Sequence, residues 1–238
     1  MESPQNPTPT TKIATEETVS TKFDVVKMTF YITYVLLITT GTITLVEALA
    51  TSNPMVRHIM NLETCISIIA GYFYSQFITK VTTASGVINY KEISEMRYAD
   101  WFITTPLMIL ALMLALSYNN KQSIHLGVYL AAALSNFAML YMGYLGEKKT
   151  VSKTTATIVG FVFFAALFAI LYFGFIQGSS KLFNFVLFGI YFVIWSLYGF
   201  VYLLDEENKN ILFNVLDLTA KCFVGLGLWA YLTKILVW

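Results

Sequence analysis

The chain has 238 residues, of which 57% are hydrophobic, 16% aromatic and only 12% charged. Soluble domains carry about 25% charged residues, so this composition excludes an ordinary soluble domain and indicates one domain embedded in membrane lipid. The formal net charge of +1 excludes a strongly basic surface, and we expect no nucleic-acid partner.

The first 22 residues differ in composition from the rest of the chain. They are polar, rich in Thr and Pro, and have no apolar core. We therefore expect a flexible polar tail over residues 1–22, in which only IATEETVSTK could form a short helix. The membrane domain is expected to cover residues 23–238.

Seven apolar stretches follow the tail, and each is long enough for a helix to cross a bilayer, which takes about 20 residues. They cover residues 27–50, 58–80, 97–118, 123–146, 154–177, 182–204 and 210–236. Turn signals such as SNP and GEKKT separate them, and the loops are mostly short, so neighbours should be antiparallel. We predict an all-α bundle of seven transmembrane helices in a multi-pass membrane protein. Lys and Arg lie on both sides and leave its orientation undecided.

The two cysteines, Cys65 and Cys222, both lie in apolar stretches and have no metal-ligand spacing. We interpret them as reduced, small hydrophobic side chains, and we predict no metal site.

Ionisable side chains within the apolar stretches are functional candidates, because charge at this depth of a membrane is costly. Asp217 and Lys221 are four residues apart in the last stretch and share a helix face. One interpretation is a buried ion pair in which each side chain neutralises the other. The other is a reactive amine, because a buried lysine readily loses its proton and attacks carbonyls. Asp100, in the third stretch, would then add a second carboxylate to stabilise the resulting cation.

Three motifs resemble the microbial (type 1) rhodopsins in helix order as well as in sequence. They are RYADWFITTPLMILAL in the third stretch, WSLYGFVYLL in the sixth and LDLTAK in the seventh. The resemblance covers about residues 25–236. The segments ISIIAGYFYSQF and MLYMGYLGE are more narrowly similar to the rhodopsins of giant viruses and their proteorhodopsin-like relatives.

The resemblance implies a chromophore, all-trans-retinal, bound to Lys221 as a Schiff base. Asp100 and Asp217 would form its counterion pair, with Arg97 beyond them on the extracellular side. After isomerisation from all-trans to 13-cis, Asp100 would accept the Schiff-base proton.

The family pattern also assigns partners to these carboxylates. Thr104 is expected to hydrogen-bond Asp100, whereas Tyr74 and Tyr198 are expected to hold Asp217 through their hydroxyls.

The retinal pocket is likewise implied by the resemblance. Trp101 and Trp195 should lie on either face of the polyene. The other expected lining residues are Tyr198, Tyr202, Thr105, Met108, Met139 and Gly143, with Phe163 or Phe164 near the ring. For Met139, Gly143 and the Phe pair, ordinary core or lipid-facing packing is the alternative.

The chain departs from the outward proton pumps at three positions. Ala111 occupies the position of the cytoplasmic proton donor, Gly199 replaces a proline, and Lys209 or Asn210 replaces an extracellular glutamate. Glu63 offers a replacement donor on the second helix, about 16 Å from the level of Tyr74 at 1.5 Å per residue.

A light-gated cation channel is the alternative to a pump. Its polar path would use Glu47, Glu63, Tyr74, Gln76, Thr104 and Asn214. Thr105 and Asn136 would face each other as a gating pair. A simpler interpretation of Glu63 and Glu47 is that each lies at the membrane boundary and reaches water.

From the residues and the resemblance together, we expect a photoreceptor that transports protons or small cations. Outward proton transport is favoured over the light-gated channel, and a photosensor acting through a separate transducer is a third alternative. We do not expect an enzyme, because the ionisable groups are explained without substrate turnover. We expect an extracellular N-terminus, and the sequence leaves open whether a homo-oligomer forms.

Overall fold

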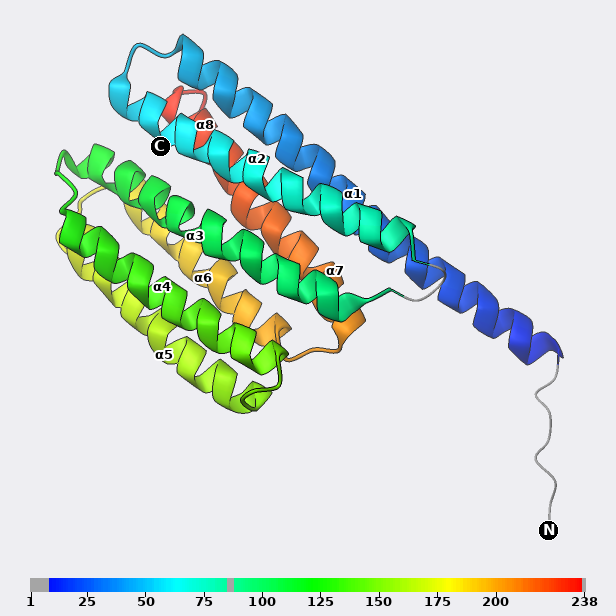
Figure 1. The fold of residues 1–238 in the computed structure, drawn as a ribbon. Helices are drawn as coiled ribbons and strands as arrows, with labels where there is room; N and C mark the ends of the chain where they lie inside the picture. Colours follow the sequence, from blue (N-terminus) through cyan, green and yellow to red (C-terminus); the bar gives the residue numbers. More distant parts are fainter. Residues whose placement is uncertain (1–8, 85–87, 237–238) are drawn as a thin grey trace.

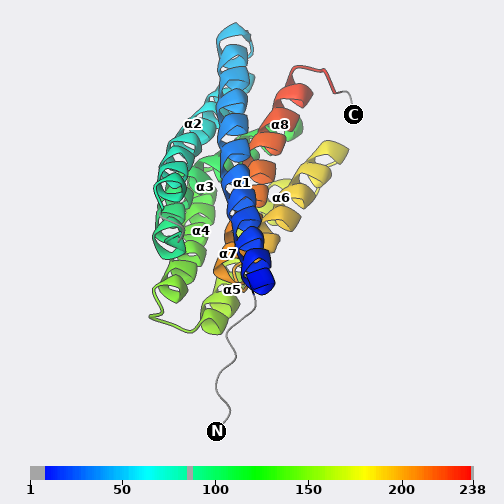
Figure 2. The same ribbon diagram turned by 90° about the vertical axis from the view of Figure 1, so that its right-hand side faces the viewer.

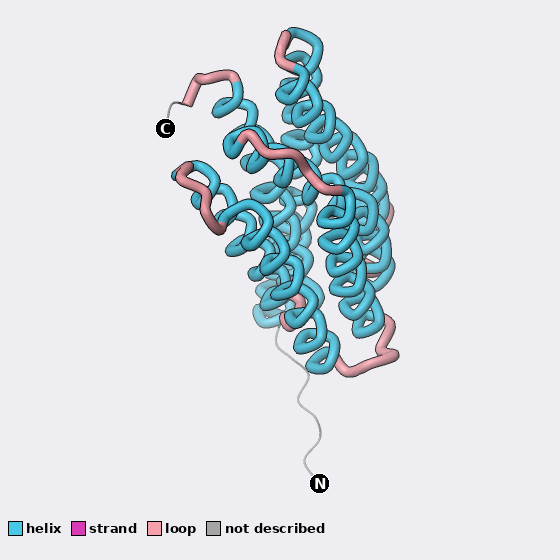
Figure 3. Tube along the Cα trace, turned by 90° about the vertical axis from the view of Figure 1, so that its left-hand side faces the viewer, coloured by secondary structure: helices cyan, strands magenta, loops and turns pink. Residues whose placement is uncertain are grey.

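The computed structural model of the protein describes residues 9–84 and 88–236, with side chains from Val25 onward. The described residues form seven helical rods and no strand (Figures 1 and 3). The first four rods are α1 (Pro9–Ala50), α2 (Pro54–Thr82), α3 (Tyr90–Asn120) and α4 (Leu126–Glu147). The fifth is α5 (Lys153–Leu171) continued by the π-helix η1 (Tyr172–Ile176), and the sixth is α6 (Leu182–Val201). The seventh joins α7 (Glu206–Asp217), the π-helix η2 (Leu218–Phe223) and α8 (Val224–Leu232).

The predicted all-α, seven-helix bundle is confirmed, and each predicted apolar stretch falls largely on one rod. Among the described residues, six rods are long and apolar enough to cross a membrane. The exception is α2, which spans 29 residues but carries polar side chains such as Glu63, Ser67 and Gln76 along its length. Polar residues on a membrane helix are expected to face the bundle interior, and Glu63 and Ser67 are indeed buried.

The N-terminal segment differs from the expected flexible tail. Helix α1 begins at Pro9, so residues 9–22 are helical, and residues 1–8 lie outside the described residues. Pro9 is suited to a first helical position because its missing N–H would be unpaired there in any case. The segment up to residue 24 contains no further Pro or Gly, so the helix extends from its membrane part at little cost.

Four of the other six helices pack against the seventh rod. Helices α1 and α2 pack side by side, as do α4 and α5, and the seventh rod contacts α1, α2, α3 and α6 (Figures 1 and 2). The C-terminus lies at the same end of the bundle as the loop between α1 and α2 (Figure 1). We call this end the C-terminal side and the opposite end, where the loop between α2 and α3 lies, the N-terminal side. Five Asp, Lys or Arg side chains of α3 and the seventh rod are buried in the interior between these ends: Arg97, Asp100, Lys209, Asp217 and Lys221.

Candidate functional site

Lys221 lies in the middle of the seventh rod, within η2, and is 2% exposed. Its Nζ donates a hydrogen bond of 2.7 Å to Asp100 Oδ2 and lies 3.6 Å from Asp217 Oδ1. The other oxygen of Asp100, Oδ1, is buried and has no hydrogen-bond partner among the described residues. One buried amine therefore faces two buried carboxylates, as the spacing of Asp217 and Lys221 and the added carboxylate of Asp100 predicted.

Arg97 lies on the N-terminal side of this group, one turn before Asp100 on α3. Its Nη1 donates to Tyr74 Oη at 3.1 Å and to Asp217 Oδ2 at 3.2 Å. Its Nη2 donates to Asn214 Oδ1 at 2.8 Å and to Asn210 Oδ1 at 3.3 Å. Two cations and two carboxylates thus balance in charge inside the bundle, which is the condition for burying any of them at moderate cost.

Asp217 is held more firmly than Asp100. Its oxygens accept hydrogen bonds from Tyr74 at 2.9 Å, from Tyr198 at 2.8 Å and from Trp101 Nε1 at 3.2 Å. The two tyrosine contacts agree with the expectation, whereas the Trp101 contact was missed by the sequence reasoning. The hydrogen bonds leave Asp217 an anion with its lone pairs occupied, while Asp100 keeps a free oxygen.

Thr104 and Thr105 both bond the backbone of α3, and Thr105 also contacts α4. Thr104 was expected to bond the Asp100 carboxylate, but its hydroxyl donates to the Asp100 backbone carbonyl at 2.9 Å. Threonine in a helix commonly bonds the carbonyl four residues earlier, and that local bond prevails here. Thr105 does the same with Trp101 at 2.7 Å and also accepts from Asn136 Nδ2 at 2.7 Å, so the predicted Thr105–Asn136 contact is confirmed.

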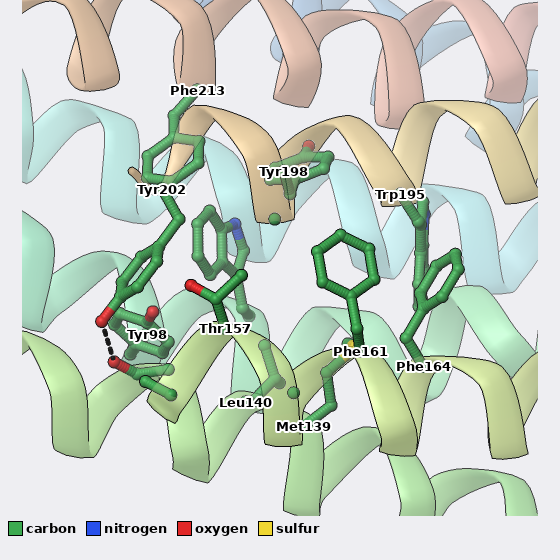
Figure 4. A pocket seen from close by; sticks show the side chains of 15 residues that line it. Tyr98, Met139, Leu140, Thr157, Phe161, Phe164, Trp195, Tyr198, Tyr202 and Phe213 are labelled. Carbon is green, nitrogen blue, oxygen red and sulfur yellow. Dashed lines mark hydrogen bonds between the residues drawn. The ribbon is translucent and has the colours of Figure 1, made fainter. Parts of the chain in front are cut away.

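An apolar space extends from Lys221 toward α5. A cavity of about 60 Å³ beside the amine is lined by Trp101, Thr105, Met108, Met139, Leu140, Trp195, Tyr198, Asp217 and Lys221. A second cavity of about 100 Å³ shares Trp101, Met139, Leu140, Trp195 and Tyr198 with the first. It adds Tyr98, Gly143, Phe161, Phe164 and Tyr202 among others (Figure 4). The two together form an elongated aromatic space that ends at a primary amine, which fits a long apolar aldehyde.

Most of the expected pocket residues line these two cavities, and one alternative is decided. Phe164 lines the second cavity, whereas Phe163 lines neither. Gly143 is required by the close approach of α3, because a Cβ there would lie 2.5 Å from Tyr98 Oη. Tyr202 reaches the same point, where its hydroxyl donates to the Gly143 carbonyl at 3.1 Å.

Glu63 lies apart from this group, on α2, and is 2% exposed. Its carboxylate touches the backbone of Gly225, since a Cβ there would lie 2.8 Å from Glu63 Oε2. Gly225 follows Lys221 by one helical turn, so Glu63 lies on the C-terminal side of the amine, opposite Arg97. It does not reach surrounding water, which excludes the boundary interpretation for this residue. Glu47, by contrast, is half-buried near the end of α1.

The comparisons with known proteins agree with this geometry. Residues 24–235 match the family described as bacteriorhodopsin-like protein. The chain belongs to this family of microbial rhodopsins. The crystal structure of the viral rhodopsin OLPVRII is similar at 45% identity and a TM-score of 0.83, covering 89% of this chain and 99% of that one.

More distant relatives extend the comparison. Bacteriorhodopsin of Halobacterium salinarum is 32% identical over 154 residues, and the match covers 56% of this rhodopsin but only 53% of that protein. The matched part therefore spans about half the length of that curated relative. The proton pumping rhodopsin AR2 from the marine alga Acetabularia acetabulum shares the fold, with a TM-score of 0.73 at 19% identity. That match covers 89% of this chain and 96% of the other.

This rhodopsin also buries a second lysine, which the sequence analysis considered only as a replacement of an extracellular glutamate. Lys209 is 0% exposed, and its Nζ donates to Glu147 Oε1 and Glu206 Oε1 at 2.8 Å each. Glu206 precedes Lys209 by three residues, so the sequence spacing could have predicted this one of the two partners. Asn214 was considered only as a pore residue, although it lies three residues before Asp217 and binds Arg97.

Proposed function

We propose that the protein is a light-driven transporter that carries retinal on Lys221 and moves protons outward. The observation that carries the proposal is the contact of Lys221 Nζ with Asp100 at 2.7 Å, at the end of an elongated aromatic cavity. A lysine in a dry pocket forms a covalent linkage with an aldehyde, and two carboxylates stabilise the cation that results. In this proposal the N-terminal side of the bundle faces the cell exterior.

Lys221 would hold retinal, which when bound would supply light absorption and a change of shape. Asp100 accepts the proton, because its Oδ1 is unoccupied and its Oδ2 already touches the nitrogen. Asp217 keeps its charge, because two tyrosines and Trp101 occupy its oxygens. Arg97, bound to Asp217 on the N-terminal side, holds positive charge near Asp100 and so favours release of the proton from that carboxyl group after the transfer.

The return proton must come from the opposite side, and Glu63 is the donor we propose. Ala111, in the position where the pumps have a donor carboxylate, is buried among apolar side chains. Glu63 is a buried carboxyl group on the C-terminal side with no ion pair among the described residues, which favours its protonated form at rest.

Flash photolysis of Glu63→Gln tests this role. Loss of the proton from the Lys221 nitrogen should occur at the normal rate. Its return should slow by roughly a hundredfold, the scale of a lost general acid, and should become strongly pH-dependent. Added azide should partly restore the rate by carrying protons. The surface variant Glu95→Gln is the matched control, and a return rate in Glu63→Gln that equals wild type at two pH values would reject the donor.

A light-gated cation channel is the second candidate, and the 2.7 Å contact between Asn136 and Thr105 favours it. That bond links α3 to α4 beside the cavity, so isomerisation there would strain it. A channel also needs a continuous polar path, and the part of α3 beyond Thr105 is lined by buried Ile109, Ala111, Leu112 and Leu116. The Asn136–Thr105 contact therefore leads into an apolar part of α3 rather than a polar path, and for this reason we prefer the pump.

Voltage-clamp recording under illumination separates the two functions. A pump gives photocurrent of constant sign over the accessible voltages, because retinal isomerisation drives the ion. A channel current reverses where the ion gradient balances the voltage. A reversal that follows the cation gradient would overturn outward proton pumping.

A further inference from the structure

Polar side chains gather around Glu63 at the place where α1, α2 and α8 meet. Thr40 and Ser67 are 0% exposed, and like Glu63 each has a side-chain oxygen with no nitrogen or oxygen partner among the described residues. The Cys222 thiol lies beside Thr40. The three oxygens are Thr40 Oγ1, Ser67 Oγ and Glu63 Oε1, three of the nine unpaired buried side-chain atoms among the described residues. Unpaired groups at this depth are costly unless water binds them, so their clustering indicates a hydrated pocket.

The backbone of the seventh rod makes room for this pocket. A Cβ on Gly225 would lie 2.8 Å from Glu63 Oε2 and 3.3 Å from Thr40 Cγ2. On the other side, Gly41 brings α1 against α2, since a Cβ there would lie 3.1 Å from Ser67 Cβ. The two glycines thus let three helices meet around one carboxylate.

Hydroxyl groups continue from this pocket toward the C-terminal side along the seam between α1 and α2. Thr44 lies one turn beyond Thr40, and its Oγ1 is 2.9 Å from Thr64 Oγ1. Both threonines are buried, and Thr64 is the neighbour of Glu63 in sequence. Glu47 follows at the next turn of α1 and is half-buried, so it meets the surface.

At the same C-terminal side, the interior between α3, α6 and α8 is closed by a network of amides. Asn184 donates to the Leu116 carbonyl at 3.2 Å and to Asn120 Oδ1 at 2.9 Å, and its own Oδ1 accepts from Asn119 at 2.8 Å. Tyr231 donates to Asn119 Oδ1 at 2.9 Å. Beneath this network lie buried apolar side chains, including Leu112, Leu116, Leu187 and Leu228.

We propose that protons reach Glu63 from the C-terminal side along the α1–α2 seam. Thr40, Thr44, Thr64 and Ser67 act as positioning residues that hold the water chain, and Gly225 keeps the Glu63 carboxylate at its inner end. Thr44 and Thr64 donate to carbonyls of their own helices at 3.0 and 2.8 Å, so their oxygens accept from water. The water molecules carry the proton, and one that enters at Glu47 is matched by one delivered to Glu63. This inference rests on the proposed donor role of Glu63.

The test measures two steps separately in membrane vesicles of the full chain. Transient absorption follows proton return to the Lys221 nitrogen, and a pH-indicator dye follows uptake from the medium. Thr40→Val and Thr44→Val keep the shape but remove the hydroxyl. Each should slow uptake about tenfold, the effect of one lost hydrogen bond, while proton return changes less than twofold. Thr39→Val, on the exposed face of the same helix, is the control and should behave as wild type.

Gly225→Ala tests the inner end. The added methyl displaces the Glu63 carboxylate, so proton return itself should slow about tenfold. Gly227→Ala is the matched control, because a Cβ there meets no atom within 4 Å. If a valine variant fails to form pigment, Thr40→Ser and Thr40→Ala replace it, and only the alanine should slow uptake.

The outcomes separate this route from the donor role. Wild-type uptake in Thr40→Val and Thr44→Val, together with slow proton return in Glu63→Gln, would overturn the route and leave the donor in place. Unchanged proton return in Glu63→Gln would overturn both. Slow uptake in the Thr39→Val control would also overturn the route, because the effect would then not depend on the seam.

Discussion

Asp100 and Asp217 are chemically identical side chains that differ in their hydrogen bonds. Asp217 accepts from two tyrosines and Trp101, and Arg97 lies beside it. Asp100 has one partner, Lys221, and one free oxygen. A proton transferred within this group therefore costs less at Asp100, which is how two carboxylates at one site take different roles.

At the residue scale, the first prediction concerns the linkage. Lys221→Ala should abolish visible absorption of protein reconstituted with all-trans-retinal, because this amine alone lies at the end of the aromatic cavity among the described residues. Lys209→Met is the control. Lys209 is equally buried but is bound to Glu147 and Glu206, so its loss should leave the pigment visible. A visible, covalently bound pigment in Lys221→Ala would contradict the assignment.

The second prediction concerns the counterion. Asp100→Asn removes the negative charge closest to the Lys221 nitrogen, so the ground state loses stabilisation relative to the excited state. The absorption maximum should shift to the red, and acidification of the wild type should act in the same direction by protonating Asp100. Asp205→Asn, at the far end of α7, should leave the spectrum unchanged. If Asp100→Asn also has the wild-type spectrum, Asp217 alone is the effective counterion.

At the scale of single elements, a side-chain cap fixes where the seventh rod begins. Asp205 caps α7, where its Oδ1 accepts from the Asn208 backbone N–H at 3.1 Å and its Oδ2 from the Asn208 amide at 2.7 Å. Within the rod, η2 replaces the regular α-helix around Lys221. Such π-helical turns are rare and are often found at functional sites.

The third prediction follows from this cap. The hydrogen bonds from Asn208 lower the pKa of Asp205 below its usual value. A carboxyl group with a lowered pKa stabilises the fold above its usual pKa, and that contribution is lost as pH falls through the folded value. Asp205→Ala should therefore lower the thermal midpoint at neutral pH, and the difference from wild type should vanish in strong acid. Asp205→Asn, which also caps helices, should retain most of the stability. An equal loss in both variants would contradict the capping role.

At the scale of the whole molecule, the start of α1 and the end of α8 lie at opposite ends of the seven-helix bundle (Figure 1). The proposed direction of transport requires Arg97 and the N-terminal side to face outward. The charge distribution is a weak guide, because buried Lys209 is neutralised by Glu147 and Glu206 on the N-terminal side. Exposed Arg57 lies on the opposite side, where it donates to the Thr51 carbonyl at 2.6 Å.

The fourth prediction tests this orientation. An epitope tag before Met1 should be accessible to antibody on intact cells, and a tag after Trp238 should be accessible only after permeabilisation. The combined result also checks that the number of crossings is odd. The reverse pattern would invert the proposed direction of proton transport without changing the chemistry at Lys221.

The seven spans and the residues at the centre of the site were determined by the sequence itself. Each span is a local property, because a helix in lipid satisfies its backbone hydrogen bonds within one segment. Lys221 and Asp217 share one helix face by spacing, and the RYADW motif identified Asp100, Arg97 and Trp101 through family resemblance.

Only the tertiary structure decided which partners these side chains bind and how deeply they are buried. The bond between Tyr74 and Asp217 joins residues 143 positions apart, and the contact between Lys221 and Asp100 joins residues 121 apart. The burial of Glu63 and Lys209 likewise depends on helices remote in sequence. The sequence also predicted a contact that does not form, because the Thr104 hydroxyl bonds the Asp100 backbone carbonyl instead of the Asp100 carboxylate. Hydrogen bonds between helices depend on rotation and packing to within a fraction of an ångström, which the pattern of residues along one chain does not encode locally.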